Sequence, residues 1–281
     1  MIRISGGFNN LGGTNSFHAP ITVGEPDMDE PDTRRADIGV LTVIDEEIRA
    51  VVEVLRNLDG CRTRRLADGP MAYEACLPGH DGRPLRIAAV QTLTRGTDSA
   101  ALACRGLIDA YHPATVLLVG IAGGVNPKVQ VGDVVLGDSV ISYDARRETA
   151  EGTRRRGQTQ VVSAAVTHRL NEFFRDRPAR GFGIHRGPIG SGNAVVTDAR
   201  SEIRHWLRDV NEKVMAVETE AAGVAQAFHE TALRAGHPVG WLPVRGISDT
   251  ADEHKTHSHH DLAARNAAAT MALLAPYLDF R

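Results

Sequence analysis

Two glutamates, Glu218 and Glu220, stand one residue apart at the end of a short apolar run at residues 214–217. Carboxylates accept hydrogen bonds and protons, so such a pair can bind or act on a ligand. Alternate side chains of a strand share one face, and both acids would point to the same side if the strand extends to them. The other interpretation is that they are solvated residues at the start of the following helix, where the helix dipole favours acids.

Three further segments carry polar residues or glycines where a buried strand ends. They are the acidic residues 45–47, the glycine-rich residues 120–124, and residues 245–249, which read Arg-Gly-Ile-Ser-Asp. Each alone is weak evidence, because acids and hydroxyls cap helices and glycines make tight turns. In an open α/β fold, however, ligands bind beyond the carboxyl ends of the strands. The segments together therefore predict one shared crevice.

The elements that must position these segments alternate between strand and helix. Strands are expected at residues 38–44, 85–90, 115–119, 134–143, 181–190, 214–217 and 241–247, and helices after residue 47, at 99–111, 162–174 and 200–210, after residue 220 and at about 261–277. Residues 58–84 favour turns and amphipathic strands, and the charged residues 144–160 favour an exposed loop. The alternation predicts an α/β three-layer sandwich with a central mixed, mostly parallel sheet flanked by helices.

Residues 1–36 differ in composition from the rest of the chain. Residues 1–24 are rich in Gly, Asn, Ser and Thr, and residues 25–35 are acidic and contain two prolines. This composition cannot build a core, which favours a flexible tail. Its short extended pieces leave open a docking arm that pairs with a sheet edge or a partner. Residues 37–281 contain no evident linker and are expected to form one domain.

The bulk composition argues against several classes of function. The formal net charge of the 281 residues is −3, so no basic field that would attract nucleic acid is expected. Apolar runs fall short of the roughly 20 residues that span a bilayer, and no signal peptide is recognisable, so a cytoplasmic location is expected. The three cysteines are widely spaced. Four histidines gather near the C-terminus, but they lack the spacing of a helical metal motif: His254, His257, His259 and His260. We expect no metal and no cofactor.

The chain from about residue 37 to 278 resembles the nucleoside phosphorylase and nucleosidase superfamily. The closer similarity is to its branch of methylthioadenosine/S-adenosylhomocysteine nucleosidases. The resemblance is carried by residues 38–47, 119–124 with 131–135, 217–222 and 244–252, which follow the family's order and rough spacing. It implies a nucleoside phosphorylase-like fold and a purine nucleoside N-glycosidase that hydrolyses the ribose–base bond of an adenosine-type nucleoside.

The resemblance also implies catalytic roles. Asp249 would be the general acid that gives a proton or a hydrogen bond to N7 of the purine, which requires a carboxyl group that holds a proton near neutral pH. Ser248 would orient Asp249. Glu47 would hold and activate the attacking water beneath the sugar. Arg245 would pair with the acids of the pocket and hold Glu47 in place.

Substrate-binding roles follow in the same way. Glu220 would accept hydrogen bonds from the ribose hydroxyls and stabilise the positive sugar of the transition state, with Glu218 in support. The other residues implied to contact the substrate are Ile121, Ala122 and Gly123 on the sugar side, Thr219 between the two acids, and Asn193 and Val195 at the base.

The sequence departs from the family at positions that touch the substrate. Thr219 replaces a methionine that packs on the ribose, Val195 replaces an aromatic residue that stacks on the base, and Ile121 replaces a small hydroxyl residue. These changes leave the bond-breaking residues in place and leave the 5′ substituent open. A phosphorylated 5′ end could be met by His254 or Lys255.

Hydrolysis is favoured over phosphorolysis on electrostatic grounds. Relatives that use phosphate carry an arginine before the glycine turn and another in the first loop, whereas here those places hold Leu118 and the acids at 45–47. An acidic loop would repel phosphate and suits activation of water. A phosphate-dependent phosphorylase stays as one alternative, and a nucleoside-binding or effector module that engages a protein partner through residues 1–36 as another. The resemblance implies a homodimer.

Overall fold

The computed structural model describes residues 35–66, 69–176, 180–232, 237–252 and 259–280. In chain order the elements are β1 (Ile38–Thr42), α1 (Asp45–Arg56), β2 (Asp59–Arg65), β3 (Met71–Pro78), β4 (Pro84–Gln91), α2 (Thr97–Tyr111), β5 (Thr115–Gly124), β6 (Val134–Ser142), β7 (Arg146–Thr149), β8 (Gly152–Arg155), β9 (Gln158–Val161), α3 (Ala164–Asp176), β10 (Ile184–Ser191), α4 (Glu202–Val210), β11 (Ala216–Glu218), α5 (Ala221–Glu230), β12 (Gly240–Asp249), α6 (His260–Leu274) and the 3₁₀ helix η1 (Ala275–Leu278). His254, Lys255 and His257, named above, lie outside the described residues.

Most of the strands form one sheet with the order β11-β10-β6-β12-β5-β1-β4-β3-β2, and β9 pairs with β6. Parallel pairing joins β4, β1, β5 and β12 in turn, and also β6, β10 and β11. Antiparallel pairing joins β12 to β6, β11 to β5, β2 to β3, and β3 to β4. Because β11 pairs with both β10 and β5, the strands around it close on themselves.

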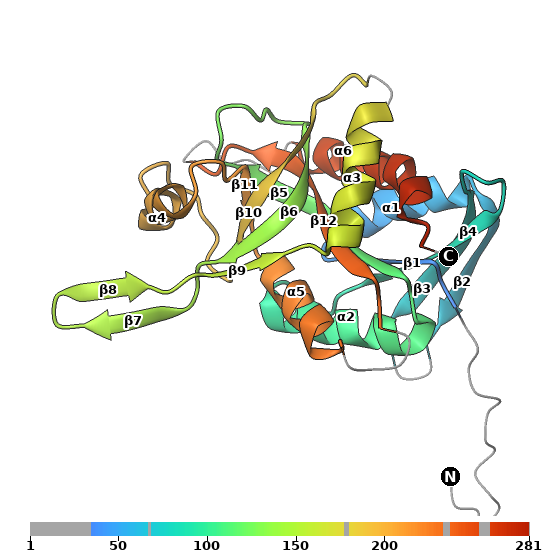
Figure 1. Ribbon diagram of the computed structural model, residues 1–281, viewed down its shortest axis with the longest axis horizontal. Coiled ribbons are helices and arrows are strands. Elements are labelled where there is room, and N and C mark those ends of the chain that lie inside the picture. The colour runs from blue at the N-terminus through green and yellow to red at the C-terminus, as the bar shows by residue number, and fades with distance from the viewer. Residues whose placement is uncertain (1–34, 67–68, 177–179, 233–236, 253–258, 281) are drawn as a thin grey trace, which may run out of the picture. The chain divides into compact units, whose positions relative to one another are not determined.

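Helices cover both faces of the sheet (Figure 1). α2 and α5 lie on one side, and α1 and α6 lie on the other. α1 buries Ile48, Val51, Val52 and Leu55, the spacing that places apolar side chains on one face of a helix. β1 and β12 are buried along their whole lengths, as expected for strands that are covered from both sides. The predicted α/β architecture, a central mixed sheet flanked by helices, is confirmed.

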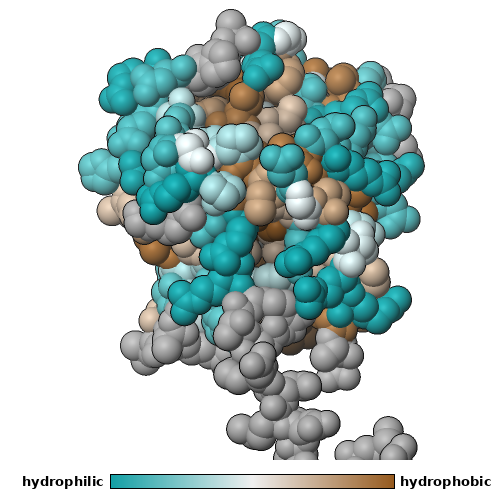
Figure 2. Space-filling view, turned by 90° about the vertical axis from the view of Figure 1, so that its right-hand side faces the viewer, coloured by the Kyte–Doolittle hydropathy of each residue, from teal (hydrophilic) through white to brown (hydrophobic). Residues whose placement is uncertain are grey.

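The antiparallel end of the sheet is polar. β2 is exposed along its whole length, and its Arg62 and Arg64 pair with Glu74 of β3. Figure 2 looks onto the side of the molecule where β2, β3 and β4 lie, and it shows hydrophilic residues over most of that face. Charged side chains on an edge strand oppose pairing with further strands.

In the part of the chain that the structure describes, no helix has the length and apolar character that crossing a membrane requires.

The prediction of a loop at residues 144–160 is wrong. β7 and β8 form a hairpin that projects from the body of the molecule, and β9 then returns to pair with β6 (Figure 1). Residues 150–151 form the turn of the hairpin, and Gly152 follows them with a φ of +118°, which is accessible to glycine. Its strands bury neither face, so the alternation of apolar and polar residues that marks a half-buried strand is missing from the sequence.

Candidate active site

Segments far apart in the sequence surround one cavity of about 130 Å³. It lies where the carboxyl ends of two sets of parallel strands meet, β1, β5 and β12 in one set and β6, β10 and β11 in the other, so these segments share one crevice. The residues that line it are Val43, Ile44, Glu47, Arg95, Ile121, Ala122, Gly123, Tyr143, Ala194, Val195, Val196, Val217, Glu218, Thr219, Glu220, Ser248 and His260.

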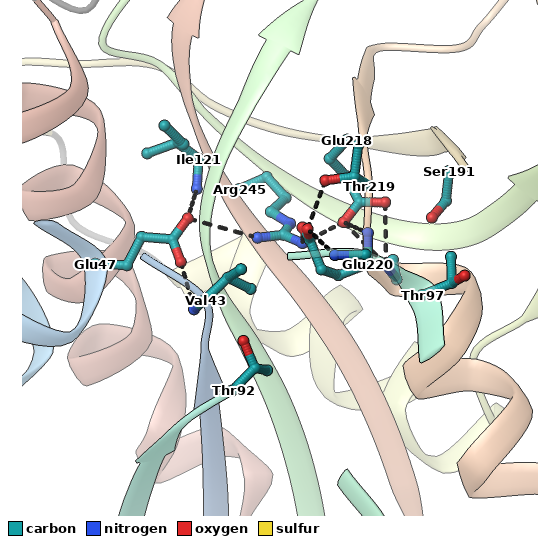
Figure 3. Close-up of polar contacts among 12 residues, drawn as sticks. Val43, Glu47, Thr92, Thr97, Ile121, Ser191, Glu218, Thr219, Glu220 and Arg245 are labelled. Atoms are coloured by element: carbon teal, nitrogen blue, oxygen red, sulfur yellow. Dashed lines mark hydrogen bonds and ion pairs between the residues drawn. The ribbon is translucent and has the colours of Figure 1, made fainter. Parts of the chain in front are cut away.

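Glu47 is held in the cavity wall by backbone amides (Figure 3). It occupies the third position of α1, from which a glutamate side chain can reach back to the helix start. Its Oε2 accepts hydrogen bonds from the N–H groups of Val43 at 2.7 Å and Ile44 at 3.1 Å, and its Oε1 accepts one from Ile121 at 2.9 Å. The side chain is only 3% exposed. The two residues that follow β1 and one residue of β5 therefore fix the carboxylate.

Arg245 of β12 lies between the acids of the site (Figure 3). Its fully buried guanidinium donates through Nη2 to Oε2 of Glu218 and, at 3.1 Å, to Oε2 of Glu220. Nη1 lies 3.9 Å from Oε1 of Glu47. Arg245 thus contacts the acids as expected, but backbone amides make the shorter contacts to Glu47.

The two glutamates after β11 have different settings. Glu218 accepts hydrogen bonds from the N–H groups of Glu220 and Ala221 at the start of α5. Glu220 lines the cavity and its Oε1 accepts hydrogen bonds from the Gly96 N–H at 3.1 Å and the Thr219 hydroxyl. β11 ends at Glu218, so the pair is not held by strand alternation; both acids meet because Arg245 lies between them.

Burial sets the protonation tendencies of this cluster. Burial raises the pKa of Glu47, against the opposing effects of Arg245 and the amides of Ile121 and Val43. Burial also raises the pKa of Glu218, and Glu220 adds to this while Arg245 lowers it. Burial alone would lower the pKa of Arg245, but the surrounding glutamates raise it, so the guanidinium stays charged.

Ser248 and Asp249 end β12 and are almost completely buried. The Ser248 hydroxyl donates to Oδ2 of Asp249 at 2.9 Å, and the Ala251 N–H donates to Oδ1 at 2.9 Å. Ser248 lines the cavity, whereas Asp249 lies directly behind the wall. A Cβ on the lining residue Gly123 would be 2.9 Å from Oδ1 of Asp249, so the carboxyl group is next to the cavity.

The glycine-rich residues 120–124 continue β5 instead of forming the expected turn. They pair with β12 on one side and, at Gly123 and Gly124, with β11 on the other. A Cβ on Gly120 would lie 2.3 Å from Oε1 of Glu47 and 2.4 Å from Nη1 of Arg245. The absent side chains allow the polar groups of the site to approach the strand, and no turn is required.

The residues expected at the base divide between two positions. Val195 lines the cavity and is 60% exposed. Asn193 is not in the cavity wall; its Oδ1 accepts a hydrogen bond from the Thr97 N–H at 3.0 Å, which ties the loop after β10 to the start of α2. Tyr143, which the sequence analysis did not select, places its hydroxyl 2.8 Å from the carbonyl oxygens of Gly192 and Ala194 and so supports this loop.

Two polar residues of the wall, Arg95 and His260, were also missed. Arg95 lies between β4 and α2, and His260 begins α6. β4 ends at the same edge of the sheet as β1, so the argument from strand ends applied to it as well. The loop after β4 holds no acid pair or glycine cluster of the kind that marks the other segments.

Among the described residues, no group of three or more His, Cys, Asp or Glu is arranged to hold a metal ion.

Comparison with known proteins identifies the family of this chain. The sequence profile of the Phosphorylase superfamily matches residues 37–278. The ATP nucleosidase Cap17 of Escherichia coli is 25% identical over 259 residues, which cover 83% of this chain and 50% of that protein. This chain therefore spans about half the length of that relative. The 5′-methylthioadenosine/S-adenosylhomocysteine nucleosidase of Haemophilus influenzae is 29% identical over 245 residues, covering 86% of this chain and 98% of the relative.

Solved structures share the fold. The 5′-methylthioadenosine/S-adenosylhomocysteine nucleosidase of Helicobacter pylori superposes with a TM-score of 0.68 at 19% identity, covering 86% of this chain and 98% of the other. The futalosine hydrolase of the same organism gives 0.67 at 20% identity, covering 86% and 97%. Because the profile spans the described fold almost from end to end, the chain belongs to the Phosphorylase superfamily.

Proposed function

We propose that this chain is a nucleosidase that hydrolyses the bond between C1′ of ribose and the base of an adenosine-type nucleoside. The observation that carries the proposal is the shared cavity: Glu47 and Glu220 both line it, and Ser248 of the same wall holds Asp249. The similarity to proteins named methylthioadenosine/S-adenosylhomocysteine nucleosidase, futalosine hydrolase and ATP nucleosidase supports the reaction type. Methylthioadenosine, S-adenosylhomocysteine and ATP differ in the group on C5′ of the ribose, so these names leave the 5′ substituent open.

Glu47 is suited to activate the attacking water. As its carboxylate accepts the proton, the water oxygen forms a bond to C1′ and the electrons of the C1′–N9 bond pass to the purine. The amides that bind both carboxylate oxygens hold the group still beneath the sugar. A carboxylate at this place also repels a phosphate dianion, which favours hydrolysis over phosphorolysis.

The leaving base and the sugar require further groups. Asp249 would donate a proton or hydrogen bond to N7, after its carboxyl group turns from Ser248 and Ala251 toward the cavity; catalytic contacts often tighten only once substrate is bound. Glu220 would accept hydrogen bonds from the ribose hydroxyls. Its negative charge would stabilise the positive sugar of the transition state, and Arg245 donates a hydrogen bond to its Oε2.

The test is base release from methylthioadenosine, S-adenosylhomocysteine, adenosine, inosine and AMP, with and without inorganic phosphate. We expect free base without phosphate. Asp249→Asn should lower kcat by roughly 10²- to 10⁴-fold, the usual contribution of a general acid, and leave the thermal unfolding temperature close to that of the parent. A fully active Asp249→Asn variant would remove Asp249 from this role, and base release that depends on phosphate would favour a phosphorylase.

Sedimentation velocity would measure whether the chain forms the homodimer that the resemblance implies.

A further inference from the structure

Arg95 carries a positive charge in the cavity wall that the proposed reaction does not use. It lies in the segment between β4 and α2, and its side chain is exposed. Among the described residues that line the cavity it is the one arginine, and no lysine joins it. Within the described part of the chain it has no hydrogen bond or ion pair. The other arginine of the site, Arg245, is already engaged by glutamates.

The order of the strands places Arg95 at one end of the site. Across the sheet, β10, β6, β12, β5, β1 and β4 are neighbours in that order. The loop after β10 holds Val195, β12 ends at Asp249, Glu47 follows β1, and Arg95 follows β4. A base at Val195 and Asp249, with C1′ above Glu47, directs the rest of the sugar toward the end of β4.

The ribose subsite and the segment of Arg95 are also joined directly. The N–H of Gly96, the residue after Arg95, donates to Oε1 of Glu220 at 3.1 Å. If Glu220 accepts hydrogen bonds from the ribose hydroxyls, C4′ and its C5′ substituent lie next to this segment. An arginine side chain there is long enough to reach a group attached to C5′.

We propose that Arg95 binds an anionic group on C5′, so that this chain acts on a nucleoside 5′-phosphate in preference to an uncharged nucleoside. The inference rests on the proposed nucleosidase function. A guanidinium binds phosphate oxygens through two parallel N–H bonds, and this pairing is among the strong charge-assisted hydrogen bonds. Glu47 beneath C1′ opposes binding of free phosphate at the attacking position. The partner of the Arg95 guanidinium is therefore the anionic group of the substrate itself and not free phosphate.

The experiment compares kcat/KM for AMP and for adenosine, with and without inorganic phosphate. The parent chain should prefer AMP. In Arg95→Ala the ratio of the two kcat/KM values should fall roughly 10- to 100-fold, the loss expected for a hydrogen bond to a charged group. Arg95→Lys should recover part of the ratio. Arg105→Ala is the matched control, because Arg105 is an exposed arginine of α2 that pairs with Asp109 and does not line the cavity.

Three results would overturn the inference. The first is an AMP-to-adenosine ratio of kcat/KM that stays constant in Arg95→Ala. The second is an equal loss of kcat/KM for both substrates, which would show that Arg95 only balances the charge of the acids. The third is base release that requires inorganic phosphate. Titration of AMP into the Asp249→Asn variant, with and without Arg95→Ala, gives a binding readout that needs no turnover. Equal release from adenosine and AMP by the parent contradicts this inference alone, whereas release from neither contradicts the proposed function.

Discussion

A single buried arginine determines the charge balance of the site. Arg245 is fully buried, and it contacts two glutamates that are also nearly inaccessible to solvent. Removing one partner from such a cluster leaves charge without compensation in a medium of low polarity, which is strongly destabilising. The arrangement therefore makes Arg245 a residue of the fold as much as of the chemistry.

We expect Arg245→Met to lower the free energy of unfolding by about 3–5 kcal/mol, measured by urea denaturation at pH 8. The deficit should shrink as the pH is lowered. Burial already raises the pKa of Glu218, and loss of the cation raises it further, so protonation at low pH favours the folded variant. Arg105→Met, at an exposed arginine paired with Asp109, should change stability by less than about 0.5 kcal/mol. A deficit that grows toward pH 5 would contradict this account.

Glu47 should control the acidic side of the pH profile. Burial raises its pKa above the usual 4.5, and only the ionised carboxylate can accept the proton of the attacking water. With saturating substrate, kcat should therefore fall as the pH drops through a value above 4.5. Glu47→Gln should lower kcat by roughly 10²- to 10⁴-fold and abolish this limb. The neighbouring Glu46→Gln should keep both the parent kcat and the acidic limb of the pH profile. If Glu47→Gln still shows that limb, the limb belongs to another group.

At the scale of elements, the contact between α2 and α5 determines where the sugar-binding residues lie. α5 begins directly after Glu220, and α2 begins directly after Gly96, whose N–H donates to Glu220. The two helices approach so closely that a Cβ on Gly223 of α5 would lie 1.9 Å from the backbone oxygen of Thr97. The absence of a side chain at Gly223 therefore sets the spacing between Glu220 and the segment of Arg95.

We expect Gly223→Ala to destabilise the protein by roughly 1–3 kcal/mol, the cost of overpacking, and to raise KM. The matched control is Gly106→Ala, also in a helix, where a Cβ would meet nothing within 4 Å. Because alanine favours helix more than glycine does, Gly106→Ala should stabilise by about 0.5–1 kcal/mol. Thermal and urea unfolding of both variants measure the difference. Equal shifts in the two would show that the helix contact does not constrain Gly223.

The elements that could be predicted from sequence are those that bury a face. The apolar runs of β1, β5 and β12 and the helical spacing of α1 follow directly from burial, and they place Glu47 and Ser248 at one edge. The β7–β8 hairpin buries neither face and left no periodic signal. The glycines at the end of β5 predict a turn, because glycine is typical both of turns and of close approach between backbone and side chains, and only the neighbouring side chains distinguish the two.

At the scale of the whole molecule, the domain of the family accounts for the described fold. The family profile begins at residue 37, and the chain divides between Thr33 and Arg34. Ala36 already belongs to the folded part, because it is buried and its N–H donates to the carbonyl oxygen of Tyr111 at 2.9 Å. A boundary one or two residues before Ala36 is therefore safer for truncation than the boundary after residue 36 that composition indicated.

We expect deletion of residues 1–34 to leave the thermal unfolding temperature and the kcat for base release within measurement error, since the cavity is built from residues 43–260. The same truncation tests the alternative that the chain is a nucleoside-binding or effector module with a protein partner. If residues 1–34 are a docking arm, the truncated chain keeps its catalysis and loses a protein partner that the full chain retains. Loss of catalysis on truncation, with the domain still folded by circular dichroism, would instead place residues of the extension in the nucleosidase site and contradict the one-domain account of the activity.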